Sequence, residues 1–108
     1  DLGRRGEEAA LDFLLSKGYT FVSKNFRNKL GEIDLIMRDR GTVIGVEVKA
    51  KRVGGIDPSE MLTQKKIDKV KAVLNSIAWN CHDKRIECVT VLFDYRDQVV
   101  SIDHFDEI

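Results

Sequence analysis

The feature that most constrains the fold of this chain is a pair of β-rich runs, Glu32 to Arg38 and Thr42 to Lys51, separated by a short turn-forming stretch. Side chains alternate along a strand, so each run has a wholly apolar face and a second face that is apolar near the turn and charged away from it. In the first run the apolar face consists of Ile33, Leu35 and Met37. The two runs therefore predict an antiparallel hairpin with an apolar face and a charged open end.

The carboxylates at the open end of this hairpin are predicted to face each other. A turn with two central residues, 40 and 41, makes the numbers of facing residues sum to 81, which sets Asp34 opposite Glu47 and Glu32 opposite Lys49. Facing like charges destabilise a sheet by about 0.2 to 1 kcal/mol when exposed, and by more when partly buried. Asp34 and Glu47 therefore need a neutralising partner.

A divalent cation held by Asp34 and Glu47 would supply that partner, because hard ions such as Mg²⁺ take one or two carboxylates together with water and phosphate oxygens. Lys49, on the face of Glu47, would then orient an attacking water or stabilise the charge of a pentacovalent phosphate. The alternative is a cross-strand ion pair between Glu32 and Lys49 without a metal. A register slip of one residue would instead point the two charged sets to opposite faces.

The rest of the chain supplies the covering elements. Apolar residues recur at helical spacing from Gly6 to Lys17, ahead of a stop at Gly18, and from Pro58 to Asn80, behind a capping box at Asp57 to Glu60. Three further β-rich runs predict strands at Tyr19 to Phe26, Ile86 to Phe93 and Val99 to Ile102. The order αβββαβ with a closing strand predicts an α/β fold, a mixed central sheet flanked by two helices.

Glu7 is the acidic residue of the first helix that is predicted to face inward. It precedes Ala10, Leu11 and Leu14 by three, four and seven residues, so it extends the apolar stripe of that helix. A carboxylate on the core-facing side needs a partner, which makes Glu7 a candidate fourth member of the site. The alternative is an ordinary first-turn acid that interacts with the helix dipole.

Length and composition exclude several classes of protein. The chain has 108 residues, which fits a single domain, 1–108, and its 18 basic and 18 acidic residues give zero net charge. This balance argues against nucleic-acid binding by a bulk positive field, but basic clusters at 24–29, 49–52 and 65–71 can still line a groove for phosphates. No apolar run approaches the ~20 residues of a membrane span and the first residues lack a signal core, so we expect a cytoplasmic protein. Cys81 and Cys88 lack the spacing of a zinc site, and a disulfide is not expected in that compartment.

Several motifs in combination resemble the PD-(D/E)xK nuclease superfamily, and more narrowly its YraN-type family of predicted endonucleases. They are a Gly-x-x-Gly-Glu in the first helix, a Gly-Glu-Ile-Asp-Leu-Ile run, and a Val-Glu-Val-Lys run whose glutamate follows the aspartate by thirteen residues. The resemblance covers Gly3 to about Val91 and implies a restriction-endonuclease-like αβββαβ core. The chain departs from the pattern at Ile33 in place of Pro, Gly45 in place of Phe and Ala50-Lys51 in place of Thr-Arg.

Carried over residue by residue, the resemblance implies that Asp34 and Glu47 bind a Mg²⁺ or Mn²⁺ cofactor, with the Val48 carbonyl as a further ligand. It makes Lys49 the catalytic lysine and Glu7 the helix glutamate that completes the catalytic and metal site. Lys66 matches a basic position that faces the site in related nucleases. The residues expected to contact nucleic acid are Arg27, Lys51, Arg52, Lys66 and Lys69.

The sequence therefore predicts a metal-dependent endonuclease that cleaves nucleic acid, with DNA as the expected substrate, in DNA processing or repair. The alternative is a catalytically inactive nucleic-acid-binding or scaffolding module on the same fold, in which the acidic cluster is structural. A homodimer would suit cleavage of two strands, but a single sequence identifies no interface.

Overall fold

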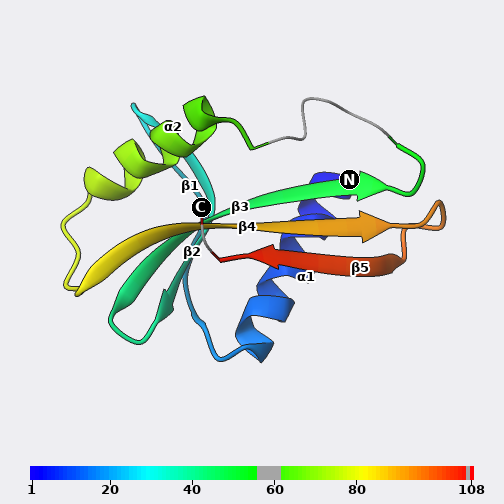
Figure 1. Ribbon diagram of the computed structural model, residues 1–108, viewed down its shortest axis with the longest axis horizontal. Helices are drawn as coiled ribbons and strands as arrows, with labels where there is room; N and C mark the ends of the chain where they lie inside the picture. The colour runs from blue at the N-terminus through cyan, green and yellow to red at the C-terminus, as the bar shows by residue number, and fades with distance from the viewer. Residues whose placement is uncertain (56–61, 107) are drawn as a thin grey trace.

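A five-stranded mixed sheet forms the centre of the protein in a computed structural model that describes residues 1–55, 62–106 and 108 (Figure 1). The strands lie side by side in the order β1-β2-β3-β4-β5; β3 and β4 run parallel, and the other neighbouring pairs are antiparallel. This is the predicted α/β fold, consistent with a restriction-endonuclease-like core. The elements are α1 (Leu2–Ser16), β1 (Thr20–Asn28), β2 (Gly31–Asp39), β3 (Thr42–Arg52), α2 (Gln64–Asn75), β4 (Asp83–Phe93) and β5 (Val99–Phe105).

The helix α1 covers one face of the sheet. Its buried residues Ala10 and Leu14 pack against apolar side chains of β2, β3 and β4. It begins four residues before the predicted Gly6, because the Asp1 side chain caps the helix by accepting a hydrogen bond from the Arg4 backbone N–H. Gly6 is buried where the helix meets β3, and a Cβ there would lie 2.6 Å from the Cβ of Ala50. The missing side chain therefore lets the start of α1 approach the sheet closely.

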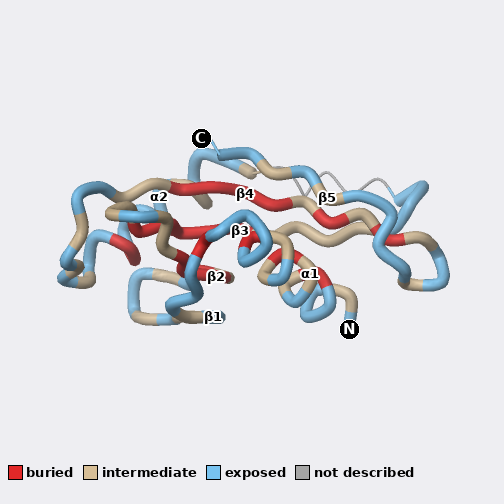
Figure 2. The backbone as a smooth tube through the Cα atoms, turned by 90° about the horizontal axis from the view of Figure 1, so that it is seen from below, coloured by how far each residue is buried: buried red, intermediate tan, exposed pale blue. Residues whose placement is uncertain are grey.

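The helix α2 covers part of the opposite face. Its buried residues Val70, Val73 and Leu74 form a second core with apolar side chains of β2, β3 and β4, and the two cores show as a buried band along the inner strands (Figure 2). Neither helix in the described ranges is long and apolar enough to cross a membrane.

The second helix is shorter than the predicted span of residues 58–80. It begins at Gln64 behind the cap Thr63, and the predicted capping box at 57–60 lies outside the described residues. It ends at Asn75, because the chain folds back and the Trp79 indole N–H donates to the Leu74 carbonyl at 3.0 Å. That carbonyl is one of those a helix end leaves without an internal partner. Trp79 also packs against the core under α2.

Strand boundaries differ from prediction at the ends. The fourth strand begins at Asp83 instead of Ile86, and the fifth continues to Phe105 instead of Ile102. In both cases the extra residues are polar or exposed, and they are held in the sheet by main-chain pairing with a neighbouring strand. A prediction based on apolar content therefore underestimates the length of these two strands.

Candidate active site

The hairpin of β2 and β3 has the predicted register near its turn. Five facing pairs, from the turn to Leu35 and Val46, have numbers that sum to 81, which confirms the two-residue turn at 40 and 41. The main-chain ladder ends at this pair, so Asp34 and Glu47 lie where the two strands separate. The carboxylates therefore stand at a gap in the sheet.

The strand β2 changes its alternation at this gap. Ile33 and Ile36 both belong to the core under α2, whereas Leu35 belongs to the core under α1. The prediction that Ile33 shares a face with Leu35 is therefore wrong. Asp34 lies at the change of face, and its Oδ2 accepts a hydrogen bond from the Val48 N–H at 2.8 Å. A side-chain carboxylate thus satisfies a β3 donor beyond the end of the ladder.

Glu47 is buried, with 9% of its surface exposed. Burial, the charge of Asp34 and a hydrogen bond between the two carboxyl groups raise the pKa of Glu47 to about 8, against a smaller lowering by nearby lysines. Burial also raises the pKa of Asp34, although the Val48 hydrogen bond opposes this. Two carboxyl groups in contact do not readily ionise together, so the pair tends to retain one proton at neutral pH.

Two lysines bring positive charge to the carboxyl pair. Lys49 follows Glu47 on the same face of β3, and Lys66 reaches the pair from the first turn of α2. Contact with Lys49 and its positive charge lower the pKa of Lys66, whereas Glu47 and Asp34 act in the opposite sense. A hollow of about 250 Å³ opens here, lined by Glu32, Asp34, Glu47, Lys66, Lys69 and Val70.

Glu7 lies on the α1 side of the gap. It lines a separate hollow of about 100 Å³ together with Lys24 and Asn25. Burial and the charge of Asp34 raise the pKa of Glu7, whereas a hydrogen bond with Asn25 lowers it. Glu7 thus lies within electrostatic reach of Asp34. Among the residues that the structure describes, however, no three His, Cys, Asp or Glu side chains are close enough to hold one metal ion.

The metal-free alternative, an ion pair between Glu32 and Lys49, is not found in the described part of the chain. Glu32 faces Arg27 of β1, with 3.8 Å between guanidinium nitrogen and carboxylate oxygen. Arg27, which was predicted to contact nucleic acid, therefore lies on β1 opposite Glu32, and this carboxylate partly neutralises its charge.

The other predicted nucleic-acid contacts lie in different surroundings. Lys69 lines the hollow beside the carboxyl pair. Lys51 belongs to the same alternating set of β3 as Glu47. Arg52 forms an ion pair of 2.9 Å with Asp97, in the turn between β4 and β5. The structure therefore brings Lys69 to the site and gives Arg52 a structural partner.

A buried polar network on the α1 face was missed by sequence reasoning. Glu87 of β4 is fully buried and accepts hydrogen bonds from the Tyr19 hydroxyl at 2.9 Å and from Arg85 Nε at 2.6 Å. His104 Nε2 lies 2.7 Å from the same carboxylate, and Lys17 Nζ lies 3.2 Å from His104 Nδ1. Because a charged lysine only donates, Nδ1 accepts and Nε2–H donates to Glu87. The one sequence signal was an acidic residue inside an apolar strand.

Comparisons with known proteins identify related sequences. A family model described as "Uncharacterised protein family UPF0102" matches residues 6–91, which include the carboxyl pair and both nearby lysines. A UPF0102 protein of Clavibacter michiganensis is 43% identical over 86 residues, covering 79% of this chain and 72% of that protein. A UPF0102 protein of Caldicellulosiruptor saccharolyticus is 37% identical over 108 residues, covering 94% and 91%. One from Clostridium botulinum strain Kyoto is 42% identical over 109 residues, covering 94% and 88%.

Proposed function

The chain belongs to the UPF0102 family, and we propose that it is a divalent-metal-dependent nuclease that cleaves nucleic acid phosphodiesters. Mg²⁺ or Mn²⁺ is the proposed metal, and DNA is the proposed substrate. The observation that carries the proposal is the carboxyl pair of Asp34 and Glu47, in hydrogen-bonding contact at a gap between strands, with Lys49 and Lys66 beside it.

The oxygens at this gap suit a hard divalent cation. Burial raises the pKa of both carboxyl groups and the charge of Asp34 raises that of Glu47 further, so a doubly charged ion between them would favour both ionised forms. The Val48 N–H points to Asp34, and since the N–H and C=O of one strand residue project to the same side, its carbonyl also faces the gap. Two carboxylates and one carbonyl match the few protein ligands that Mg²⁺ uses, with water and phosphate oxygens completing its shell.

The chain's own side chains have distinct roles in this proposal. The bound metal would supply positive charge to the phosphate and activate a water molecule. Lys49 would donate a hydrogen bond to that water or to the phosphate as negative charge develops. Lys66 and Lys69 would hold non-bridging phosphate oxygens, and Glu7 would accept a hydrogen bond from a water on the α1 side of the gap.

Metal binding is tested first, by melting curves of the protein titrated with Mn²⁺ or Mg²⁺. A ligand that binds the native state stabilises it by RT ln(1 + [L]/Kd), about 2.7 kcal/mol at a hundredfold excess over Kd. The wild type should gain stability, and Asp34→Asn and Glu47→Gln should lose the gain. Glu8→Gln is the matched control, because Glu8 is exposed on α1 and pairs with Arg4 on the surface. Equal gains in all four proteins would refute the assigned ligands.

Cleavage is tested on single-stranded, duplex, flap and four-way-junction DNA and on matched RNA. Lys49→Ala should keep the metal-induced rise in melting temperature but lose turnover. Lys65→Ala, an exposed α2 lysine outside the lining of the hollow, should keep both. Nucleic-acid binding without cleavage of any substrate would establish the inactive module instead.

A further inference from the structure

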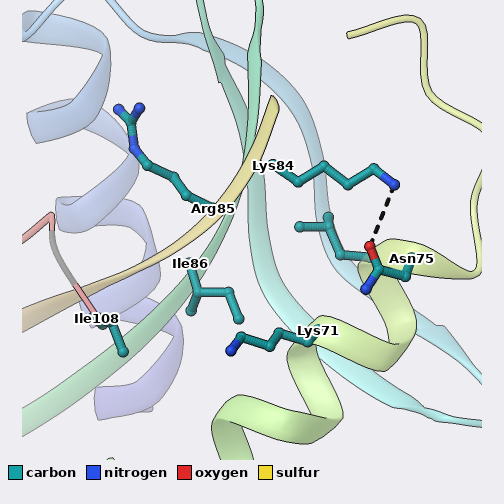
Figure 3. Close-up of a pocket in the computed structure, with 7 residues that line it drawn as sticks. Lys71, Asn75, Lys84, Arg85, Ile86 and Ile108 are labelled. Atoms are coloured by element: carbon teal, nitrogen blue, oxygen red, sulfur yellow. Dashed lines mark hydrogen bonds between the residues drawn. The ribbon is translucent and has the colours of Figure 1, made fainter. Parts of the chain in front are cut away.

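We propose that a second hollow, between α2 and the start of β4, binds a backbone phosphate of the same nucleic acid strand; this inference rests on the proposed function. The hollow has a volume of about 250 Å³, and its α2 residues lie toward the end of that helix, away from Lys66 in the first turn (Figure 3). The side chains that line it are Lys71, Leu74, Asn75, Lys84, Arg85, Ile86 and Ile108.

The described lining of this hollow contains cationic groups and no carboxylate side chain. Lys71 comes from α2 and Lys84 from β4, and neither forms an ion pair within the described residues. The Arg85 side chain extends to the other side of β4, where it pairs with Glu87 (Figure 3). Lys71 and Lys84 carry two positive charges, against one main-chain carboxylate at Ile108, the last residue of the printed sequence. The hollow therefore keeps a net positive charge, and an anion is the complementary ligand.

The surroundings of the two lysines favour anion binding. Lys84 Nζ donates to the Asn75 side-chain oxygen at 3.3 Å, which holds it near the end of α2 and leaves two of its three N–H donors for a ligand (Figure 3). Leu74 and Ile86 are buried beneath, with exposures of 2% and 4%. An apolar floor lowers the local dielectric constant, so the ammonium groups act on a bound phosphate more strongly than they would in bulk water.

The position of the hollow fits one strand that also occupies the carboxyl-pair site. Lys84 lies four residues before Cys88, the parallel partner of Glu47. Four residues of strand and one spacing between strands put Lys84 about 14 Å from Glu47, backbone to backbone. A nucleic acid strand advances ~3.4 Å per nucleotide, so the span corresponds to about four nucleotides. Since α2 sends Lys66 to one hollow and Lys71 to the other, a strand along this helix would meet both.

The experiment measures equilibrium binding of labelled DNA to the full chain with Ca²⁺ in place of Mg²⁺, across a series of salt concentrations. Each lost phosphate contact should reduce the slope of log K against log salt by about 0.9. At 0.1 M salt this corresponds to a roughly eightfold loss of DNA affinity. We expect these losses for Lys71→Ala and for Lys84→Ala, and about twice the slope change for the double variant. Arg96→Ala is the charge-matched control, in the exposed turn at the opposite end of β4 from Lys84 (Figure 1).

The outcomes separate this inference from the proposed function. If the wild type binds and cleaves DNA but the Lys71 and Lys84 variants behave like the Arg96 variant, the second phosphate site is refuted and the nuclease remains. If the wild type binds no nucleic acid, both fail. A second measurement, melting curves of the protein at rising concentrations of inorganic phosphate, tests whether the hollow binds a free anion. Stabilisation that both lysine variants lose, together with unchanged DNA binding, would assign the hollow to a free anion and overturn its role in strand binding.

Discussion

Replacing Glu47 by Gln tests the electrostatics of the carboxyl pair without any assumption about activity. Gln has nearly the shape of a protonated Glu but does not ionise, so the substitution removes one charge and little packing. Burial and Asp34 raise the pKa of Glu47 from 4.5 to about 8 in the folded protein. The folded state therefore holds a proton that the unfolded chain releases between these two values.

The size of the effect follows from the two pKa values. Below pH 4.5 the carboxyl group is protonated in both states and imposes no penalty on folding. Above that pH the penalty grows by about 1.4 kcal/mol per pH unit until the folded group also ionises. With a folded pKa of about 8, wild-type stability is lowered by about 1 kcal/mol at pH 5, about 3 kcal/mol at pH 7 and about 5 kcal/mol at pH 9. Glu47→Gln escapes this penalty, so it should be increasingly more stable than the wild type as pH rises.

The assay is urea unfolding of the wild type and Glu47→Gln with EDTA at pH 5, 7 and 9, with Glu8→Gln as an exposed control. The difference in unfolding free energy between Glu47→Gln and the wild type should widen by several kcal/mol across this range, whereas that of Glu8→Gln should stay within about 0.5 kcal/mol. Excess Mn²⁺ should reverse the order of wild type and Glu47→Gln at pH 7. A difference that does not change between pH 5 and pH 9 would refute a buried, proton-sharing pair.

Three further predictions concern metal affinity, the helix–sheet contact and the buried network. The apparent Mn²⁺ affinity by calorimetry should rise about tenfold per pH unit up to about pH 8, because the ion displaces the proton held by Glu47, and should level off above it; a flat profile would contradict this. Gly6→Ala should lower the free energy of unfolding by about 1 to 3 kcal/mol because its Cβ meets Ala50. Gly3→Ala is the control: its Cβ would lie 3.3 Å from the movable side-chain oxygen of Asp1, so the change should be under about 1 kcal/mol; equal urea midpoints for the two variants would refute the close contact at Gly6. Glu87→Ala should cost about 3 to 5 kcal/mol because it leaves Arg85 and two other donors without their acceptor; a loss under 1 kcal/mol would mean that the network contributes little to stability.

The site residues were predictable from sequence to the extent that their positions depend on local geometry. The turn after Asp39 and the alternation of β3 are local, and together they gave the register as far as Leu35 and Val46. That register placed Asp34 and Glu47 together at the open end of the hairpin, where the structure finds them. The carried-over position of Lys66 also agrees, since it lines the same hollow.

Other features depended on contacts that sequence spacing does not contain. The ladder ends before Asp34 because β2 changes face there. Leu35 packs in the core under α1, whereas Ile33 and Ile36 pack in the core under α2. The raised pKa of Glu47 comes chiefly from burial, and α2, which covers this face, ends where a returning tryptophan binds its last turn. Glu7, predicted to complete the site, lies across the gap beside Asn25.

The sequence by itself determined the elements, their order and the pairing near the turn, because periodicity and turn chemistry act over a few residues. Tertiary structure alone decided which polar groups share a buried environment. Glu87 and Tyr19 are 68 positions apart in the chain, yet they are joined by a hydrogen bond in the core. The second basic hollow likewise forms only when α2 lies beside the start of β4. Such groupings depend on how the layers pack, and no local pattern encodes that packing.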